Sequence, residues 1–212
     1  MAERKPATPA TKLIPESPTL SELRKLAAGC QACDLWRNAT QTVFGAGAEN
    51  PEVVLIGEEP GNQEDLQGKP FVGPAGKILD RAMEQAGIDR NAVYITNAVK
   101  HFKWTPKGKL RIHQKPRADE IEACRPWLDA EIALTRPKLI VCLGATAAQS
   151  LLGSKFRLTQ HRGEFISTPL KPPITATVHP SAILRAPTDK ARHSMMDEFV
   201  RDLRVVARKL RA

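Results

Sequence analysis

Apolar residues follow two different spacings along the chain, and these spacings predict alternating strands and helices. Short continuous apolar runs, typical of strands buried on both faces, occur at 53–56, 93–96, 139–143 and 174–178. Apolar residues three and four positions apart, typical of helices, occur at 20–29, 75–86, 118–134, 146–152 and 189–210. We therefore expect an α/β fold, with a single three-layer α/β/α domain and a central, mainly parallel sheet.

Local sequence signals place several helix boundaries. Thr19 and Glu22 form a capping-box pattern at the start of the first helix, and Gly29 is a natural stop at its end. Pro126 is expected to interrupt the helical region 118–134, because proline removes a backbone donor.

Length and composition indicate one folded domain with a tail. Residues 1–18 are rich in Pro, Thr, Ala and Lys without apolar periodicity, so we expect a disordered tail there and a domain over 19–212. The 212 residues are 42% apolar and 26% charged, which is globular composition. No apolar run approaches the ~20 residues that cross a bilayer, and no signal peptide is evident. We expect a cytoplasmic protein without a membrane partner.

The charge favours a polyanionic partner. Lys and Arg outnumber Asp and Glu by 32 to 23, a net charge of +9, and such an excess favours nucleic acid. The four cysteines are poor candidates for disulfides in a reducing compartment. They are better candidates for metal binding, redox chemistry or simple burial.

Polar residues gather directly after the predicted strands. Glu58 and Glu59 follow the first strand, Asn97 the second and His179 the last. The carboxyl ends of parallel strands meet at one edge of a sheet, where open α/β folds bind their ligands. One such loop is compatible with a solvated turn, but two carboxylates, an Asn and a His at one edge favour an active site.

Several segments carry a family resemblance. They read Gly-Glu-Glu-Pro-Gly at 57–61, Pro-Phe-Val-Gly-Pro-Ala-Gly at 70–76, Thr-Asn-Ala-Val-Lys at 96–100 and His-Pro-Ser at 179–181. Together they resemble the motifs of the uracil-DNA glycosylase superfamily, in particular its iron–sulfur members.

The inserted loop narrows the resemblance. Lys-Leu-Arg-Ile-His at 109–113 is similar to the hallmark of the family X enzymes, which bond covalently to uracil-containing DNA. The resemblance runs from about residue 20 to residue 210. Two residues depart from the family pattern. Leu110 stands where the family usually has a basic residue, and Glu59 stands where it usually has Gln. These departures concern the anchoring of the loop and the pocket.

The resemblance assigns two residues to recognition of the base. Asn97 corresponds to the family residue that reads uracil. The chemistry suits this role, since one side-chain amide can satisfy both the O4 acceptor and the N3 donor of uracil, whereas cytosine presents the opposite pair. Phe71 would stack on a base flipped out of the duplex. Taken alone, an Asn at a strand end such as Asn97 is more often a turn former, and Phe71 is more often a core residue under the loop.

Cleavage leaves a cationic sugar and an anionic base, and the resemblance distributes those charges over side chains. Glu58 would stabilise the cation, and His179 would donate a hydrogen bond to uracil O2. Arg185 resembles part of the loop that holds the duplex open, and otherwise it would contact phosphate. The remaining substrate-binding residues implied are Glu59, Asp65 and Ser181.

A metal centre is indicated by Cys30 and Cys33. By spacing alone, this pair is compatible with zinc, a redox site or a cluster. The resemblance implies a 4Fe-4S cluster with Cys124 as a third ligand and His101 where the relatives carry a cysteine. A rival set replaces His101 with Cys142, although Cys142 lies in an apolar run typical of a buried thiol. The cluster is expected to be structural, since the cleavage needs no electron.

Three functions are therefore open. The first excises uracil and then bonds His113 to C1′ of the abasic sugar, and the basic loop 102–116 favours it. The second is an ordinary hydrolytic uracil-DNA glycosylase with turnover, in which His113 only contacts phosphate. The third is a noncatalytic iron–sulfur DNA-binding module, which the joint presence of a carboxylate, an Asn and a His disfavours. For the first two we expect a nucleoid-associated monomer acting on uracil-containing DNA, single- or double-stranded.

Overall fold

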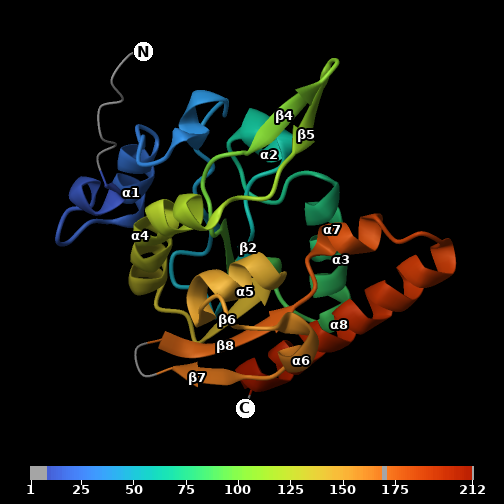
Figure 1. The fold of residues 1–212 in the computed structure, drawn as a ribbon. Helices are drawn as coiled ribbons and strands as arrows, with labels where there is room; N and C mark the ends of the chain where they lie inside the picture. The colour runs from blue at the N-terminus through green and yellow to red at the C-terminus, as the bar shows by residue number, and fades with distance from the viewer. Residues whose placement is uncertain (1–8, 169–170, 212) are drawn as a thin grey trace.

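Six strands form the central sheet, in the order β1-β3-β2-β6-β8-β7. The computed structural model describes residues 9–168 and 171–211 (Figure 1). The four inner strands run parallel and are β2 (Val53–Gly57), β3 (Val93–Asn97), β6 (Leu139–Leu143) and β8 (Lys171–Thr177). The two edge strands are antiparallel to their neighbours and are β1 (Ala46–Gly47) and β7 (Ile166–Thr168). The predicted mainly parallel sheet is confirmed, and its two antiparallel edges are additions to the prediction.

Helices cover both faces of this sheet (Figure 1). They are α1 (Leu20–Ala27), α2 (Asn62–Gln67), α3 (Pro74–Ala86), α4 (Ala118–Thr135), α5 (Ala145–Leu152), α6 (Leu158–His161), α7 (Pro180–Leu184) and α8 (Asp189–Arg211). Val53 and Leu55 of β2 pack into a core with α3 and α8. Val54 and Ile56, which point to the other face, pack with α4 and α5. The three-layer α/β/α architecture is confirmed.

Helix α4 continues through Pro126 and is one element from Ala118 to Thr135, so the predicted interruption is wrong. Trp127 and Leu128, which follow the proline, are completely buried. A proline costs an interior helix roughly 3 kcal/mol, and burial of two large apolar side chains offsets a cost of that size.

A two-stranded hairpin replaces the loop expected after the second strand. Strands β4 (Trp104–Lys107) and β5 (Leu110–His113) pair in antiparallel register, and the hairpin projects from the body of the domain (Figure 1). Gly108 takes a left-handed conformation at its turn, with φ of 59°. The hairpin carries His113 at its base, opposite Trp104.

Packing against the domain begins at an earlier residue than the sequence predicts. Residues 1–8 of the predicted tail lie outside the described residues, but the 3₁₀ helix η1 (Ala10–Leu13) contacts α4, and Ala10 is buried. The capping box of Thr19 and Glu22 is present at the start of α1. Two further 3₁₀ helices are η2 (Asp34–Arg37) and η3 (Arg90–Ala92). Within the described residues, no helix has the length and apolar character needed to cross a membrane.

Candidate active site

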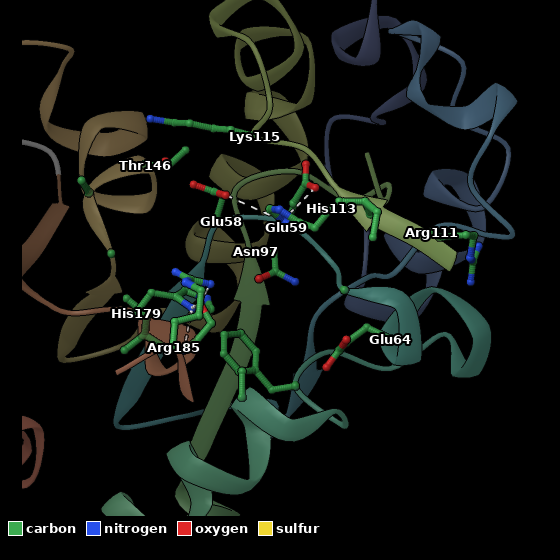
Figure 2. Close-up of a pocket in the computed structure, with 18 residues that line it drawn as sticks. Glu58, Glu59, Glu64, Asn97, Arg111, His113, Lys115, Thr146, His179 and Arg185 are labelled. Carbon is green, nitrogen blue, oxygen red and sulfur yellow. Dashed lines mark hydrogen bonds and ion pairs between the residues drawn. The ribbon is translucent and has the colours of Figure 1, made fainter. Parts of the chain in front are cut away.

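A cavity of about 780 Å³ lies at the carboxyl ends of the parallel strands (Figure 2). Glu58 follows β2, Asn97 ends β3, Gly144 follows β6 and His179 follows β8, while His113 reaches the same space from the hairpin. Eight of the nine substrate-binding and catalytic candidates line this cavity. They are Glu58, Glu59, Phe71, Asn97, His113, His179, Ser181 and Arg185.

Asn97 presents a buried acceptor to the cavity. Its side chain lies in the cavity (Figure 2), and its Oδ1 atom has no hydrogen-bond partner among the described residues. The backbone beneath it is fixed, because the buried Lys100 Nζ donates to the Asn97 carbonyl at 2.7 Å. An orphaned buried carbonyl costs free energy, and a ligand with an N–H donor would recover it.

Phe71 stands beside Asn97 in a strained backbone conformation. Its φ is 54°, which non-glycine residues adopt at a cost of about 1–2 kcal/mol. Gly57 lies against both side chains, since a Cβ there would come within 2.3 Å of Asn97 Oδ1 and 2.7 Å of the Phe71 ring. The glycine at the end of β2 therefore lets the ring and the amide face the same space.

His179 is held as a neutral donor. The backbone N–H of Ser181 donates to His179 Nδ1 at 3.1 Å, so the ring proton resides on Nε2. Burial, with smaller effects of Arg185 and His113, lowers the pKa of His179 to about 4. Its ring centroid is 5.8 Å from that of Phe71. At neutral pH, His179 therefore offers an N–H without carrying a charge.

His113 lies between two carboxyl groups. Its Nε2 atom is 3.1 Å from Glu59 Oε1 and 3.8 Å from Glu58 Oε1. Burial raises the pKa of Glu59 to about 10, with a smaller contribution from Glu58. Burial also lowers the pKa of His113, against the opposing effect of Glu58. The geometry and the pKa shifts favour an uncharged Glu59–His113 pair.

Asp65 does not line the cavity, contrary to the expectation from the sequence. It is completely buried, and its carboxylate accepts a 2.6 Å hydrogen bond from Arg111 and a 2.9 Å bond from the backbone N–H of Thr40. Arg111 also donates to Asn62 at 2.7 Å. The buried carboxylate needs a cationic partner, and Arg111 on β5 supplies it. Asp65 thus anchors the hairpin that carries His113.

Other residues line the cavity that were not assigned to it from sequence. Glu64 accepts a 2.7 Å hydrogen bond from the Gly73 backbone N–H, which joins α2 to the start of α3. Lys115, Thr146 and Arg111 also contribute to the lining. Thr146 could have been found from its place three residues after β6, whereas the position of Glu64 depends on a contact with Gly73 that no local pattern indicates.

Three of the four proposed metal ligands share one core cluster. Cys30, Cys33 and Cys124 lie together at the N-terminal end of the domain. The Lys100 backbone N–H donates to Cys124 Sγ and Trp127 Nε1 donates to Cys30 Sγ, both at 3.2 Å. Among residues 9–168 and 171–211, no three Cys, His, Asp or Glu side chains are grouped so as to hold a metal ion.

The two rivals for the fourth ligand occupy different places. Cys142 is buried on β6 in the core beneath α4 and α5, a different cluster from that of the other thiols. His101 is buried, and its Nε2 atom is 2.9 Å from Thr42 Oγ1. Thr42 donates its hydroxyl proton to the Ala27 carbonyl, so it accepts from His101 Nε2–H. Nδ1 of His101 is then the nitrogen with the lone pair.

Comparison with known proteins places the chain in a family. A family model described as the uracil DNA glycosylase superfamily matches residues 44–204. A Type-4 uracil-DNA glycosylase of Sulfurisphaera tokodaii is 33% identical over 201 residues, covering 90% of this chain and 87% of that protein. Type-4 enzymes of Thermotoga maritima and Saccharolobus solfataricus are 36% and 38% identical, covering 80% and 78% of this chain and 85% and 76% of theirs. This chain therefore belongs to the uracil-DNA glycosylase superfamily.

Proposed function

We propose that this protein flips uracil out of DNA, cleaves its glycosidic bond and then captures the abasic sugar through His113. The observation that carries the proposal is the buried, unpartnered Oδ1 of Asn97. Uracil N3–H is the donor that this acceptor lacks, and the Asn97 amide N–H can donate to O4. The Type-4 relatives, whose name specifies uracil in DNA, support this choice of base.

Bond cleavage separates charges of opposite sign. The electron pair of the N1–C1′ bond leaves with uracil, and the negative charge on O2 would be met by His179 Nε2–H. A neutral donor suits this task, because a cationic ring would also bind bulk anions and lose its hydrogen bond from Ser181. Glu58, whose side chain is 23% exposed, remains open to the cavity and would face the cationic sugar.

Capture follows because His113 is near the same sugar. The lone pair of a neutral imidazole would bond to C1′ once uracil has left, in competition with water. Placement in the cavity makes the reaction intramolecular, with effective molarities that reach ~10⁵ M in well-oriented systems. The Arg111–Asp65 pair supports the proposal, because it fixes the strand that carries His113.

A basic surface around the cavity supports DNA as the substrate. Lys115 and Arg185 line the cavity, and the exposed Lys107 and Lys109 lie at the tip of the hairpin. Such side chains neutralise phosphates, so binding would weaken as salt increases.

We further propose that Cys30, Cys33, Cys124 and His101 hold a 4Fe-4S cluster. Clustering of three thiols and the two N–H donors to sulfur fit such a group, since hydrogen bonds to sulfur are part of its usual surroundings. His101 fits through Nδ1, because Thr42 engages its other nitrogen. When bound, the cluster would supply a covalent tie between the segment after α1, the segment after β3, and α4.

A denaturing gel tests the function directly. Wild-type protein mixed with uracil-containing single-stranded DNA should release uracil and give a shifted band that survives heat and detergent. Asn97→Ala should strongly reduce uracil release, and thymine or cytosine should not be released. Repeated turnover without a shifted band would favour the hydrolytic glycosylase, and DNA binding without uracil release would favour the noncatalytic module.

A further inference from the structure

Glu59 is the nearer of the two carboxyl groups beside Nε2 of His113, with its Oε1 atom at 3.1 Å and that of Glu58 at 3.8 Å. The Glu59 side chain has no exposed surface, while His113 is about half exposed, with 0% and 47% of their side-chain areas accessible. The Lys103 backbone N–H donates to Oε1 of Glu59 at 3.2 Å, which fixes the oxygen that faces the imidazole. Oε2 has no hydrogen-bond partner within the described part of the chain.

Burial favours the uncharged form of both groups. The pKa of Glu59 lies at about 10, so this side chain is a carboxylic acid at neutral pH. A buried carboxylate without a paired cation is costly, and the lack of a partner for Oε2 points the same way. The pKa of His113 is lowered, so its ring is neutral.

The protonation state of Glu59 decides which tautomer of His113 fits. A carboxylate can only accept, so it would require a proton on Nε2 and would leave the lone pair on Nδ1. A carboxylic acid can donate to Nε2, which then accepts and requires the proton on Nδ1. Nε2 is the ring nitrogen between Glu58 and Glu59 at the cavity, and it reacts only if it carries the lone pair.

We propose that Glu59 is a positioning residue whose carboxyl proton is donated to Nε2 and holds His113 in the reactive Nδ1–H tautomer. This inference rests on the proposed capture by His113. In that step the Glu59 hydrogen bond to Nε2 breaks, and the Nε2 lone pair bonds to C1′ after the N1–C1′ pair has left with uracil. Glu59 keeps its proton, and the resulting imidazolium loses its Nδ1 proton to water.

The inference is specific to this chain, because a glutamine at position 59 cannot titrate. Its amide can donate to Nε2 at every pH, so Glu59→Gln is the conservative variant that should preserve the tautomer. Glu59→Leu removes the donor. The charged groups facing Glu59 are Glu58, Lys103 and Glu120.

The experiment measures how the abasic sugar is partitioned between bonding to His113 and reaction with water. Wild type, Glu59→Gln and Glu59→Leu are each mixed with uracil-containing single-stranded DNA from pH 7 to about 10.5, a range chosen to span the pKa of Glu59. The covalent adduct is divided by the total uracil released, which cancels changes in excision. Besides Glu59, the charged groups that face His113 are Glu58 and Arg185, and both are unchanged in all three proteins.

In wild type the adduct fraction should fall as pH approaches 10, whereas in Glu59→Gln it should stay level. Glu59→Leu should give an adduct fraction about tenfold lower at pH 7, the size of one lost hydrogen bond. An adduct fraction that rises with pH, or an alkaline fall equally present in Glu59→Gln, would overturn the tautomer assignment alone. Uracil release without any adduct in wild type would overturn the capture and this inference with it.

Discussion

The carbonyl of Phe71 lies directly against Gly76 in the first turn of α3. A Cβ at position 76 would come within 1.8 Å of Phe71 O and 3.0 Å of Phe71 Cα. The left-handed backbone of Phe71, with φ of 54°, therefore depends on a neighbour without a side chain. This pair fixes the position of the Phe71 ring, which lines the cavity, and so links Gly76 to the proposed stacking of Phe71 on the base.

We expect Gly76→Ala to displace Phe71 and to reduce uracil release at least tenfold, because the added methyl cannot be accommodated without a backbone shift. Single-turnover excision assays measure this loss. Gly87→Ala is the control, since Gly87 ends the same helix in a left-handed conformation with φ of 72°, and a Cβ there meets nothing within 4 Å. It should lower stability by about 1 kcal/mol and keep excision. Equal excision by the two variants would contradict the role of Gly76.

The buried ion pair beneath Asn97 gives a stability prediction. Glu131 and Lys100 are 2.5 Å apart with side-chain exposures of 0% and 1%. Glu131→Ala leaves the ammonium buried without its carboxylate and should cost about 3–5 kcal/mol in the free energy of unfolding. Denaturant titration measures the change. Glu52→Ala breaks an exposed pair with Lys138 and should cost less than about 1 kcal/mol.

Strands and pocket residues were predictable where the signal is local. The inner strands are continuous apolar runs, and the polar residues after them meet because parallel strands share an edge. The hairpin was missed because Pro106 and the exposed lysines around it give β4 no alternating pattern. Asp65 was misplaced because its partner, Arg111, is 46 residues away in sequence, and only the fold brings them together.

Stability should depend on pH through His179. Its pKa is about 4 in the folded protein and about 6.5 when unfolded, so the unfolded state binds more protons between these values. The contribution of neutral, buried His179 to the free energy of unfolding is complete above pH 6.5 and is lost as pH falls toward 4. Chemical unfolding from pH 7.5 to 4.5 should therefore show falling stability. His179→Asn should reduce that slope, and an unchanged slope would contradict the assigned burial.

The cysteines should separate by iron content. Cys30→Ala and Cys124→Ser should lose iron, sulfide and visible colour, because each removes a thiol of the N-terminal cluster. Cys142→Ser should keep them, since Cys142 lies in the other core. Metal analysis and absorption spectra of the purified variants decide the outcome. If Cys142→Ser bleaches the protein while His101→Ala does not, Cys142 replaces His101 in the ligand set.

Anchoring of the hairpin should control capture more than base recognition. Arg111 joins Asp65 and Asn62 to the strand that ends at His113, whereas Asn97 and Phe71 are fixed by the sheet and α3. Arg111→Ala should release the strand and lower the adduct fraction at least tenfold, with a smaller loss of uracil release.

Lys109→Ala is the control for loss of one positive charge on the same hairpin. Lys109 is exposed at the turn, so its removal should weaken DNA binding and reduce the salt dependence by about one counterion without changing the adduct fraction. Quantitative gels of adduct and released uracil, with binding measured at several salt concentrations, separate the two variants. Equal adduct fractions for Arg111→Ala and wild type would show that His113 holds its position without the anchor, because the paired strand and the Glu59 contact would then suffice.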